Sequence, residues 1–122
     1  MNRLGGGRVE AYSAGSHPVG RVNPVALALL SEKGFDIDDF RSKSWDEFHE
    51  SSGISFDFVI TVCDQAAAEA CPVWRGAPSL AHWSLKDPAA VNGSASEIRT
   101  AFEATYRDLE ARIQKLLNTA TP

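Results

Sequence analysis

The sequence predicts an α/β fold with a mainly parallel sheet, and two observations support this prediction. Residues Phe56–Cys63 form a nearly continuous apolar run that is rich in β-branched and aromatic side chains. Such a run is typical of a strand that is covered on both faces, as the strands of parallel sheets are. Near the carboxyl terminus, apolar residues recur every three or four positions, which indicates a long amphipathic helix. Strands that alternate with helices predict a three-layer sandwich whose functional loops follow the carboxyl ends of the strands.

Two shorter strands are expected on either side of this run. Residues Arg8–Ser13 alternate between apolar and polar side chains, a pattern typical of a short strand. Residues Leu80–Leu85 indicate another strand. Between Cys63 and Pro72 the alanine-rich sequence favours a helix, so a helix separates the second strand from the third.

Capping signals predict where the other helices begin and end. Asn23 and Pro24 are a favoured N-cap and first helical residue, and Gly34 can take the left-handed conformation that ends a helix. Ser44 and Glu47 have the spacing of a reciprocal capping box, which predicts a short helix to about Glu50.

A second capping box opens the long helix at Ser94 and Glu97. We expect this helix to end at about Leu117 and to pack lengthwise on the sheet. Its apolar face is formed by Ile98, Phe102, Tyr106, Leu109, Ile113 and Leu116.

Composition limits the partners that this chain can have. The 122 residues are 43% hydrophobic and carry a formal net charge of -4, which predicts one globular domain spanning residues 1–122. Its basic residues are scattered, so neither a nucleic-acid partner nor an anionic membrane is expected. The longest aliphatic run, Val25–Leu30, is far too short to span a membrane, and the first residues lack the apolar segment of a signal peptide. We therefore expect a cytoplasmic protein.

The two cysteines, Cys63 and Cys71, are the first candidates for chemistry. If residues 64–70 are helical, the two α-carbons lie roughly 12 Å apart, whereas a disulfide requires less than about 7 Å. A disulfide could then form only when the segment unwinds, which favours a reversible redox switch over a static structural bond. The alternative is that both are small buried apolar residues. His82 is the only extra ligand nearby, so a zinc site is not expected.

Asp87 is the second candidate. It follows the last expected strand, and Pro88 holds it out of helical geometry. A carboxyl group in such a loop could act as a general acid over the sheet's carboxyl edge, although an aspartate that only initiates a turn is the alternative. His82 and Trp83 are interpreted as packing residues.

Taken together, several short motifs make the chain similar to the thioredoxin-coupled arsenate reductases, which are built on the low-molecular-weight tyrosine phosphatase fold. The motifs occur in the family's order and cover nearly the whole chain. They are Val9–Gly15, Val22–Pro24, Arg41–Ser44, Phe56–Cys63, Cys71–Pro72, His82–Trp83 and Asp87–Ala89.

This resemblance implies a relay of three cysteines. In the family, a nucleophilic cysteine in an anion-binding loop attacks arsenate, a second cysteine releases arsenite, and a third closes the final disulfide. By resemblance Cys63 is the second cysteine, Cys71 the third and Asp87 the general acid. The implied partners are an arsenate or phosphate oxyanion and thioredoxin or another thiol reductant. Some members bind potassium through a serine like Ser13 and an aspartate at the position of Lys43; the Lys43 ammonium group would replace that ion, so neither a metal nor a cofactor is expected.

One element of the family pattern is missing. The nucleophile loop has an arginine six residues after a cysteine, but Glu69 and Ala77 occupy those positions after Cys63 and Cys71. We therefore expect a chain that is truncated at its N-terminus, lacks the family's first strand and is catalytically inactive as given. Loss of that strand would leave unpaired strand edges, so we expect either direct pairing of the neighbouring strands or a homodimer.

Two alternative functions remain at this point. The first is a low-molecular-weight tyrosine phosphatase of the same fold, although ester hydrolysis has no need of a resolving cysteine pair. The second is a non-catalytic redox-switch or binding domain that keeps only the exchange between Cys63 and Cys71.

Overall fold

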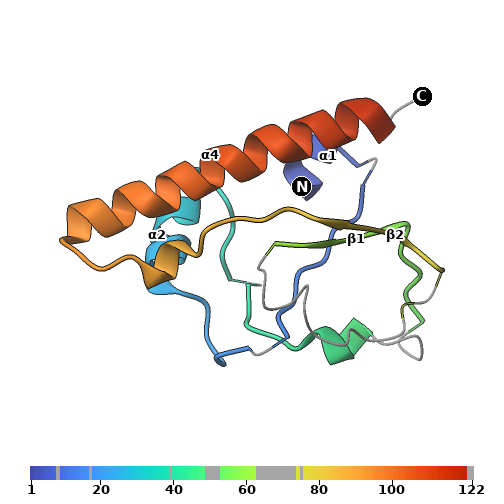
Figure 1. The fold of residues 1–122 in the computed structure, drawn as a ribbon, viewed down its shortest axis with the longest axis horizontal. Helices are drawn as coiled ribbons and strands as arrows, with labels where there is room; N and C mark the ends of the chain where they lie inside the picture. Colours follow the sequence, from blue (N-terminus) through green and yellow to red (C-terminus); the bar gives the residue numbers. More distant parts are fainter. Residues whose placement is uncertain are drawn as a thin grey trace.

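The structure, a computed structural model, describes residues 1–7, 9–16, 18–38, 40–48, 53–62, 74 and 76–120. Figure 1 shows the long helix α4 running along one side of two strands, with the short helix η1 on the opposite side. The elements in chain order are α1 (Asn2–Gly5), α2 (Pro24–Glu32), η1 (Trp45–Phe48), β1 (Phe58–Thr61), β2 (Ser79–His82), η3 (Pro88–Ala90) and α4 (Ala95–Ala120).

The sheet of the described chain consists of β1 and β2, which are parallel. Their register runs from Phe58 opposite Ser79 to Thr61 opposite His82. A parallel sheet combined with helices confirms the predicted α/β fold, and both predicted strands occur as shorter elements. Because the strands are parallel, their carboxyl ends lie at the same edge.

The predicted strand at Arg8–Ser13 is wrong for the residues that the structure describes. Residues 9–14 form no ladder, and the nearby Gly15 makes a single bridge to Ser44. The side chain of Asn2 explains the difference, because it takes both backbone groups of Ala11. Asn2 Nδ2 donates to the Ala11 carbonyl at 3.1 Å, and the Ala11 amide donates to Asn2 Oδ1 at 2.6 Å. The Asn2 side-chain amide thus satisfies the two backbone groups of Ala11 that a neighbouring strand would otherwise have to bond.

Helix α2 has the predicted boundaries. The Asn23 side chain accepts a hydrogen bond from the Val25 amide at 2.8 Å, and Pro24 is the first helical residue. Gly34, just past the helix, has a φ of 86°. The cap satisfies an amide that has no partner within the helix, so the sequence signal and the geometry agree.

The capping box predicted at Ser44 and Glu47 forms only in part. The Ser44 hydroxyl accepts from the Asp46 amide at 3.1 Å, and the Glu47 amide donates to the Ser44 carbonyl at 3.1 Å. The Glu47 carboxylate does not return to the backbone, because Arg41 binds it instead. The result is a single 3-10 turn, Trp45–Phe48, in place of the longer helix expected.

Helix α4 begins directly after the predicted N-cap, Ser94, and its capping box also forms only in part, because the Glu97 carboxylate bonds the Ser94 hydroxyl in place of the Ser94 backbone amide. The Glu97 amide donates to Ser94 Oγ at 3.1 Å, and the Ser94 hydroxyl donates to Glu97 Oε1 at 3.2 Å. The helix continues to Ala120, slightly past the predicted end. An ion pair joins Arg99 of α4 to Glu32 of α2. None of the helices within the described ranges is long and apolar enough to cross a membrane.

The buried apolar residues are not centred on the sheet. They are Leu29, Phe48, Phe102 and Leu117, which lie on α2, η1 and α4. The main contacts of α4 are with η3, α2 and α1. That this helix packs lengthwise on the strands stays a prediction. All of β2 is exposed, and Leu80 retains 67% of its accessible surface. The strands therefore lack the cover on both faces that is usual for a parallel sheet.

The Ser94 cap should contribute measurably to stability. We expect Ser94→Ala to lower the free energy of unfolding by about 1 kcal/mol, because the Glu97 amide loses its side-chain acceptor. Ser96→Ala, also exposed and in the first turn, is the matched control and should be neutral or slightly stabilising. Urea denaturation of the two variants checks this, and equal losses would contradict the capping role.

Candidate functional site

The carboxyl ends of β1 and β2 bring two polar side chains together. Thr61 ends β1 and His82 ends β2, and the register places them opposite each other. Thr61 Oγ1 lies 2.7 Å from His82 Nδ1, a hydrogen-bond distance. His82 is exposed, so it is not a core residue. The sequence alone does not give the register of the two strands, so it could not indicate that these two side chains are neighbours.

Both candidate cysteines lie outside the described residues. Cys63 follows two positions after Thr61, the last residue of β1. Cys71 precedes Trp74, which is described. Their roles, and the predicted unwinding of the segment between them, stay predictions. The fold does establish that the carboxyl ends of β1 and β2 lie at the same edge of the sheet. In the sequence, Cys63 comes two positions after the end of β1.

Asp87 lies on the loop after β2, as predicted, and it is exposed. Its backbone is extended, with φ -73° and ψ 111°, which agrees with the expected effect of Pro88. Its Oδ1 accepts a hydrogen bond from the Ala89 amide at 2.9 Å, so the residue caps η3. The carboxyl group is thereby fixed in orientation while it remains accessible to solvent. The turn-initiating role is present, and it leaves the second carboxyl oxygen available for chemistry.

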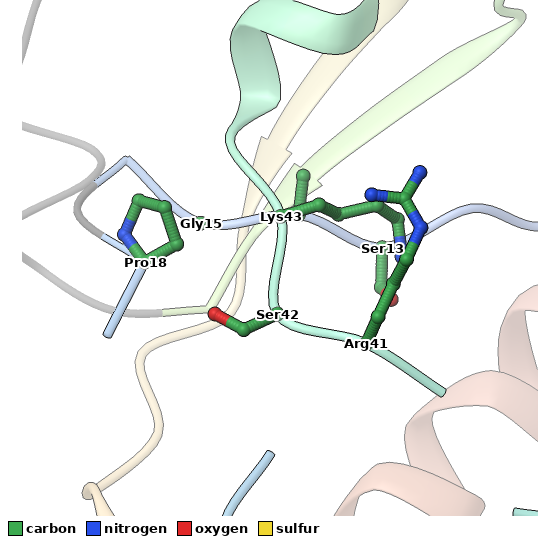
Figure 2. A pocket seen from close by; sticks show the side chains of 7 residues that line it. Ser13, Gly15, Pro18, Arg41, Ser42 and Lys43 are labelled. Atoms are coloured by element: carbon green, nitrogen blue, oxygen red, sulfur yellow. The ribbon is translucent and has the colours of Figure 1, made fainter. Parts of the chain in front are cut away.

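A shallow hollow of about 180 Å³ lies beside the bridge between Gly15 and Ser44. The Gly15 amide donates to the Lys43 carbonyl, and the Trp45 amide donates to the Gly15 carbonyl, both at 3.0 Å. Figure 2 shows that this pairing brings Ser13 and Lys43 to the same hollow, from segments distant in the sequence. The lining consists of Ser13, Ala14, Gly15, Pro18, Arg41, Ser42 and Lys43.

The expectation that the Lys43 ammonium group replaces a potassium ion requires Lys43 to lie near Ser13, and the structure supports this. Ser13 and Lys43 line one hollow, so the ammonium group belongs to the same region as the serine. Within the described ranges, no three histidine, cysteine, aspartate or glutamate side chains are grouped as metal ligands. Replacement of a cation by Lys43 stays a prediction.

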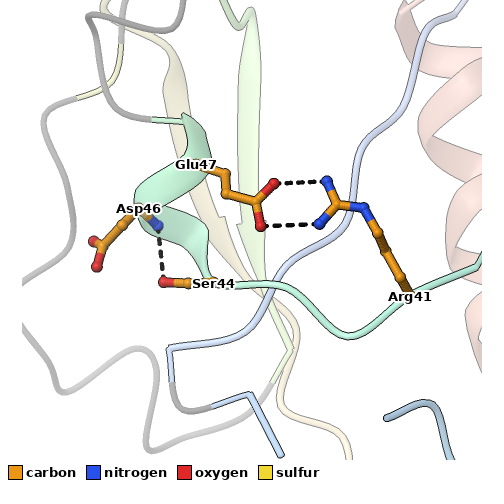
Figure 3. A network of polar contacts seen from close by, with 4 residues as sticks. All are labelled: Arg41, Ser44, Asp46 and Glu47. Atoms are coloured by element: carbon orange, nitrogen blue, oxygen red, sulfur yellow. Dashed lines mark hydrogen bonds and ion pairs between the residues drawn. The ribbon is translucent and has the colours of Figure 1, made fainter. Parts of the chain in front are cut away.

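Arg41 is held by an ion pair that sequence reasoning missed. Its guanidinium donates to both carboxylate oxygens of Glu47, at 2.6 and 3.0 Å, as Figure 3 shows. This hydrogen bonding to Arg41, together with its positive charge, lowers the pKa of Glu47. The two residues are six apart and η1 is only one turn long, so no helical spacing rule would have indicated the pair. Because Glu47 neutralises Arg41, Lys43 is the lining cation of the hollow that has no such bidentate partner among the described residues.

Over residues 1–121 the sequence matches the family described as low molecular weight phosphotyrosine protein phosphatase. The chain belongs to this family. Its similarity extends to named enzymes within the family. An arsenate reductase from Shouchella clausii is 36% identical over 110 residues, which cover 90% of this chain and 76% of that protein. The arsenate reductase of Bacillus subtilis is 29% identical over the same shares of both chains. The family assignment therefore extends to its arsenate reductases.

Other relatives agree in sequence and in structure. A protein from Synechocystis named glutaredoxin arsenate reductase is 27% identical over 93% of this chain and 79% of its own length. The solved structure of an arsenate reductase in the reduced state superposes with a TM-score of 0.63 at 28% identity, covering 94% of this chain and 82% of that one. The Archaeoglobus fulgidus arsenate reductase shares the fold, with a TM-score of 0.61 at 23% identity.

The Arg41–Glu47 pair should make stability depend on pH. Because the pKa of Glu47 is lowered in the folded protein, its contribution is complete above the unfolded pKa of about 4.3 and is lost as the pH falls through the folded value. We expect Glu47→Gln to be less stable than the wild type at pH 7, and the difference to disappear in acid.

Thermal melts from pH 7 down to about pH 3 measure this difference. Asp46→Asn is the control, since it removes a carboxylate from the same turn without touching the Arg41 ion pair. A stability difference for Glu47→Gln that did not change with pH would exclude the ion pair as its cause.

Proposed function

We propose that this chain carries the resolving half of an arsenate reductase, in which Cys63 and Cys71 act as a thiol relay and Asp87 acts as general acid. The observation that carries the proposal is the 36% identity to an arsenate reductase over 90% of this chain. The described part of the site supports it, since the carboxyl ends of β1 and β2 lie at the same edge of the sheet, and in the sequence Cys63 follows β1 and Asp87 follows β2.

The proposed chemistry is an exchange of sulfur bonds. A nucleophilic cysteine first forms a bond between its sulfur and arsenic, and an oxygen of arsenate leaves as water. The Cys63 thiolate then attacks that sulfur and forms a disulfide. The sulfur–arsenic bond breaks with its electron pair on arsenic, so As(V) is reduced to As(III) and arsenite departs. Cys71 attacks the sulfur of Cys63, which frees the nucleophile and leaves a disulfide between Cys63 and Cys71.

Asp87 supplies the proton for the departing oxygen in this scheme. Its Oδ1 is occupied by the Ala89 amide, so Oδ2 is the oxygen that would carry the proton. The cap has a second effect, because it fixes the carboxyl group without the entropy loss of ordering it during the reaction. Solvent exposure of the residue allows it to be reprotonated after each cycle.

The electron donor in this proposal is a protein dithiol such as thioredoxin. The Synechocystis relative is named a glutaredoxin arsenate reductase, so a glutaredoxin is the other candidate. Either donor reduces the Cys63–Cys71 disulfide by forming a disulfide of its own. Such a cycle requires a reducing compartment, which supports a cytoplasmic location.

The polypeptide of residues 1–122 contains neither the nucleophilic cysteine nor its arginine, because both cysteines lack an arginine six positions later. We therefore propose that this polypeptide alone holds no oxyanion for attack and does not reduce arsenate. The family also includes phosphotyrosine phosphatases, and phosphatase chemistry is the second candidate for a form that has the loop. A phosphatase would have no use for exchange between Cys63 and Cys71.

The relay predicts that mild oxidation joins Cys63 and Cys71. Treating the polypeptide with a thiol oxidant should consume both thiols and give one intramolecular disulfide, which peptide mapping identifies. Thioredoxin should restore both thiols. Cys63→Ser and Cys71→Ser are the matched controls, and neither should form a disulfide within one chain. Oxidation that gives only sulfinic acids or chain-to-chain bonds would rule out the relay.

The absence of a nucleophile loop predicts a null result in a separate assay. Arsenate-dependent oxidation of NADPH, coupled through thioredoxin and its reductase, should not exceed the rate without the polypeptide. The oxidised polypeptide should still be reduced in the same mixture, which shows that the coupling system works. Arsenate turnover would overturn the proposed inactivity while leaving the disulfide result intact.

A further inference from the structure

Trp74 is held near the amino end of β1 by aromatic and backbone contacts. Its ring centroid lies 5.8 Å from that of Phe56 and 6.4 Å from that of Trp45, and both ring pairs meet edge to face. Two residues later the chain approaches Phe56 again, because a side-chain carbon at Gly76 would lie only 2.9 Å from the Phe56 carbonyl oxygen. Phe56 comes two residues before β1. The chain that follows the cysteines is therefore packed beside the start of this strand.

The chain that precedes the cysteines is fixed at the other end of β1. The Val62 carbonyl accepts from the Leu85 amide at 3.2 Å, and at the start of the pairing the Asp57 carbonyl accepts from the Ser79 amide at 2.9 Å. At the usual rise of a strand, the paired part from Asp57 to Val62 is about 16 Å long. Cys63 follows Val62 directly in the sequence. The two cysteines thus belong to a connection whose ends are held at opposite ends of one strand.

A disulfide between Cys63 and Cys71 would shorten this connection. With the predicted helix over residues 64–70, the path from Cys63 to Cys71 covers roughly 12 Å, and the three residues to Trp74 add at most about 11 Å. In a disulfide the two α-carbons lie less than about 7 Å apart, so the total reach falls from about 23 Å to about 18 Å. The paired part of the strand alone takes about 16 Å of that reach. Oxidation therefore leaves almost no slack between Val62 and Trp74.

We propose that Trp74 is a positioning residue of the relay and that its anchor opposes oxidation. The ring contacts of Trp74 hold in the dithiol form and weaken when Cys63 and Cys71 are joined. Because these contacts stabilise only the dithiol form, they make the disulfide easier to reduce, as is typical of catalytic cysteine pairs. This inference rests on the proposed relay function. It adds a residue that returns the relay to its reduced state after each cycle.

The indole of Trp74 suits an anchor that is released during a cycle. Its Nε1 is buried and has no hydrogen-bond partner within the described part of the chain. A buried donor without a partner costs free energy, and that cost is regained when the N–H reaches water. Release of the ring gives this donor back to solvent, which offsets part of the loss of the two ring contacts. The anchor can therefore yield without breaking a hydrogen bond of its own side chain.

The first test is the reduction potential of the cysteine pair in the polypeptide of residues 1–122, measured by equilibration with glutathione. One glutathione disulfide takes two electrons and two protons from the two thiols and becomes two glutathiones. We expect Trp74→Leu to favour the protein disulfide about tenfold, which corresponds to a potential about 30 mV more negative. Trp74→Phe keeps an aromatic ring in place and should restore most of the wild-type value.

Tyr12→Leu is the matched control for a loss of stability alone. Tyr12 belongs to the same group of rings, with centroids 5.5 Å from Phe48 and 5.9 Å from Phe56, and Trp74 is not among its described ring partners. The substitution should lower stability and leave the potential unchanged. Equal shifts for Trp74→Leu and Tyr12→Leu, or no shift for either, would overturn this inference and leave the relay intact. A wild-type chain that forms no internal disulfide would overturn the relay and this inference together.

Tryptophan fluorescence provides a second measurement. The chain has three tryptophans, Trp45, Trp74 and Trp83. In the double variant Trp45→Phe with Trp83→Phe, the remaining indole should shift its emission to longer wavelength on oxidation, because it moves from the ring cluster toward water. A dithiol reductant should reverse the shift. Unchanged emission in a sample whose disulfide is verified by mass spectrometry would contradict the release of Trp74.

Discussion

The parallel pairing of β1 with β2 is the constraint on which the candidate site depends. It aligns the carboxyl ends of two strands that are distant in the sequence, and the contact between Thr61 and His82 marks that alignment. The chain then continues from β1 to Cys63 and from β2 to Asp87. This register brings together the ends of the two strands that the residues proposed for thiol exchange and for proton transfer follow in the sequence. The site is thus specified by backbone hydrogen bonds before any catalytic side chain is considered.

The same pairing explains why the other edge of β1 is exposed. Each residue of a strand directs its backbone groups to a single edge, so one partner can satisfy only half of them. The segment that the sequence predicts as a neighbouring strand is held by the Asn2 side chain at Ala11. That local solution satisfies one residue without building a ladder. The helices have buried apolar residues on α2 and α4, and the sheet keeps an apolar surface in contact with water.

Sequence reasoning succeeded where the determining contacts are local. The caps at Asn23 and Ser94 involve residues within three positions of each other, and in both the predicted side chain accepts a helix amide. It failed where a distant group competes. Arg41 takes the carboxylate of Glu47 away from its capping box, and the register that joins Thr61 to His82 becomes visible only in three dimensions. The resemblance to arsenate reductases supplied the family, which propensity and spacing alone could not have given.

The structural role of Asp87 and the chemical role proposed for it use different atoms of one side chain. As an N-cap, a carboxylate needs only one oxygen to accept a backbone amide, and Oδ1 does this at Ala89. As a general acid, it needs a proton on the other oxygen and an approach from solvent, and the residue is exposed. The cap is therefore compatible with the proposed acid role, because it fixes the direction in which a proton would be presented. The same reasoning explains why the short motif of aspartate and proline suits this position: Pro88 keeps Asp87 extended, and the extended backbone allows the cap to form.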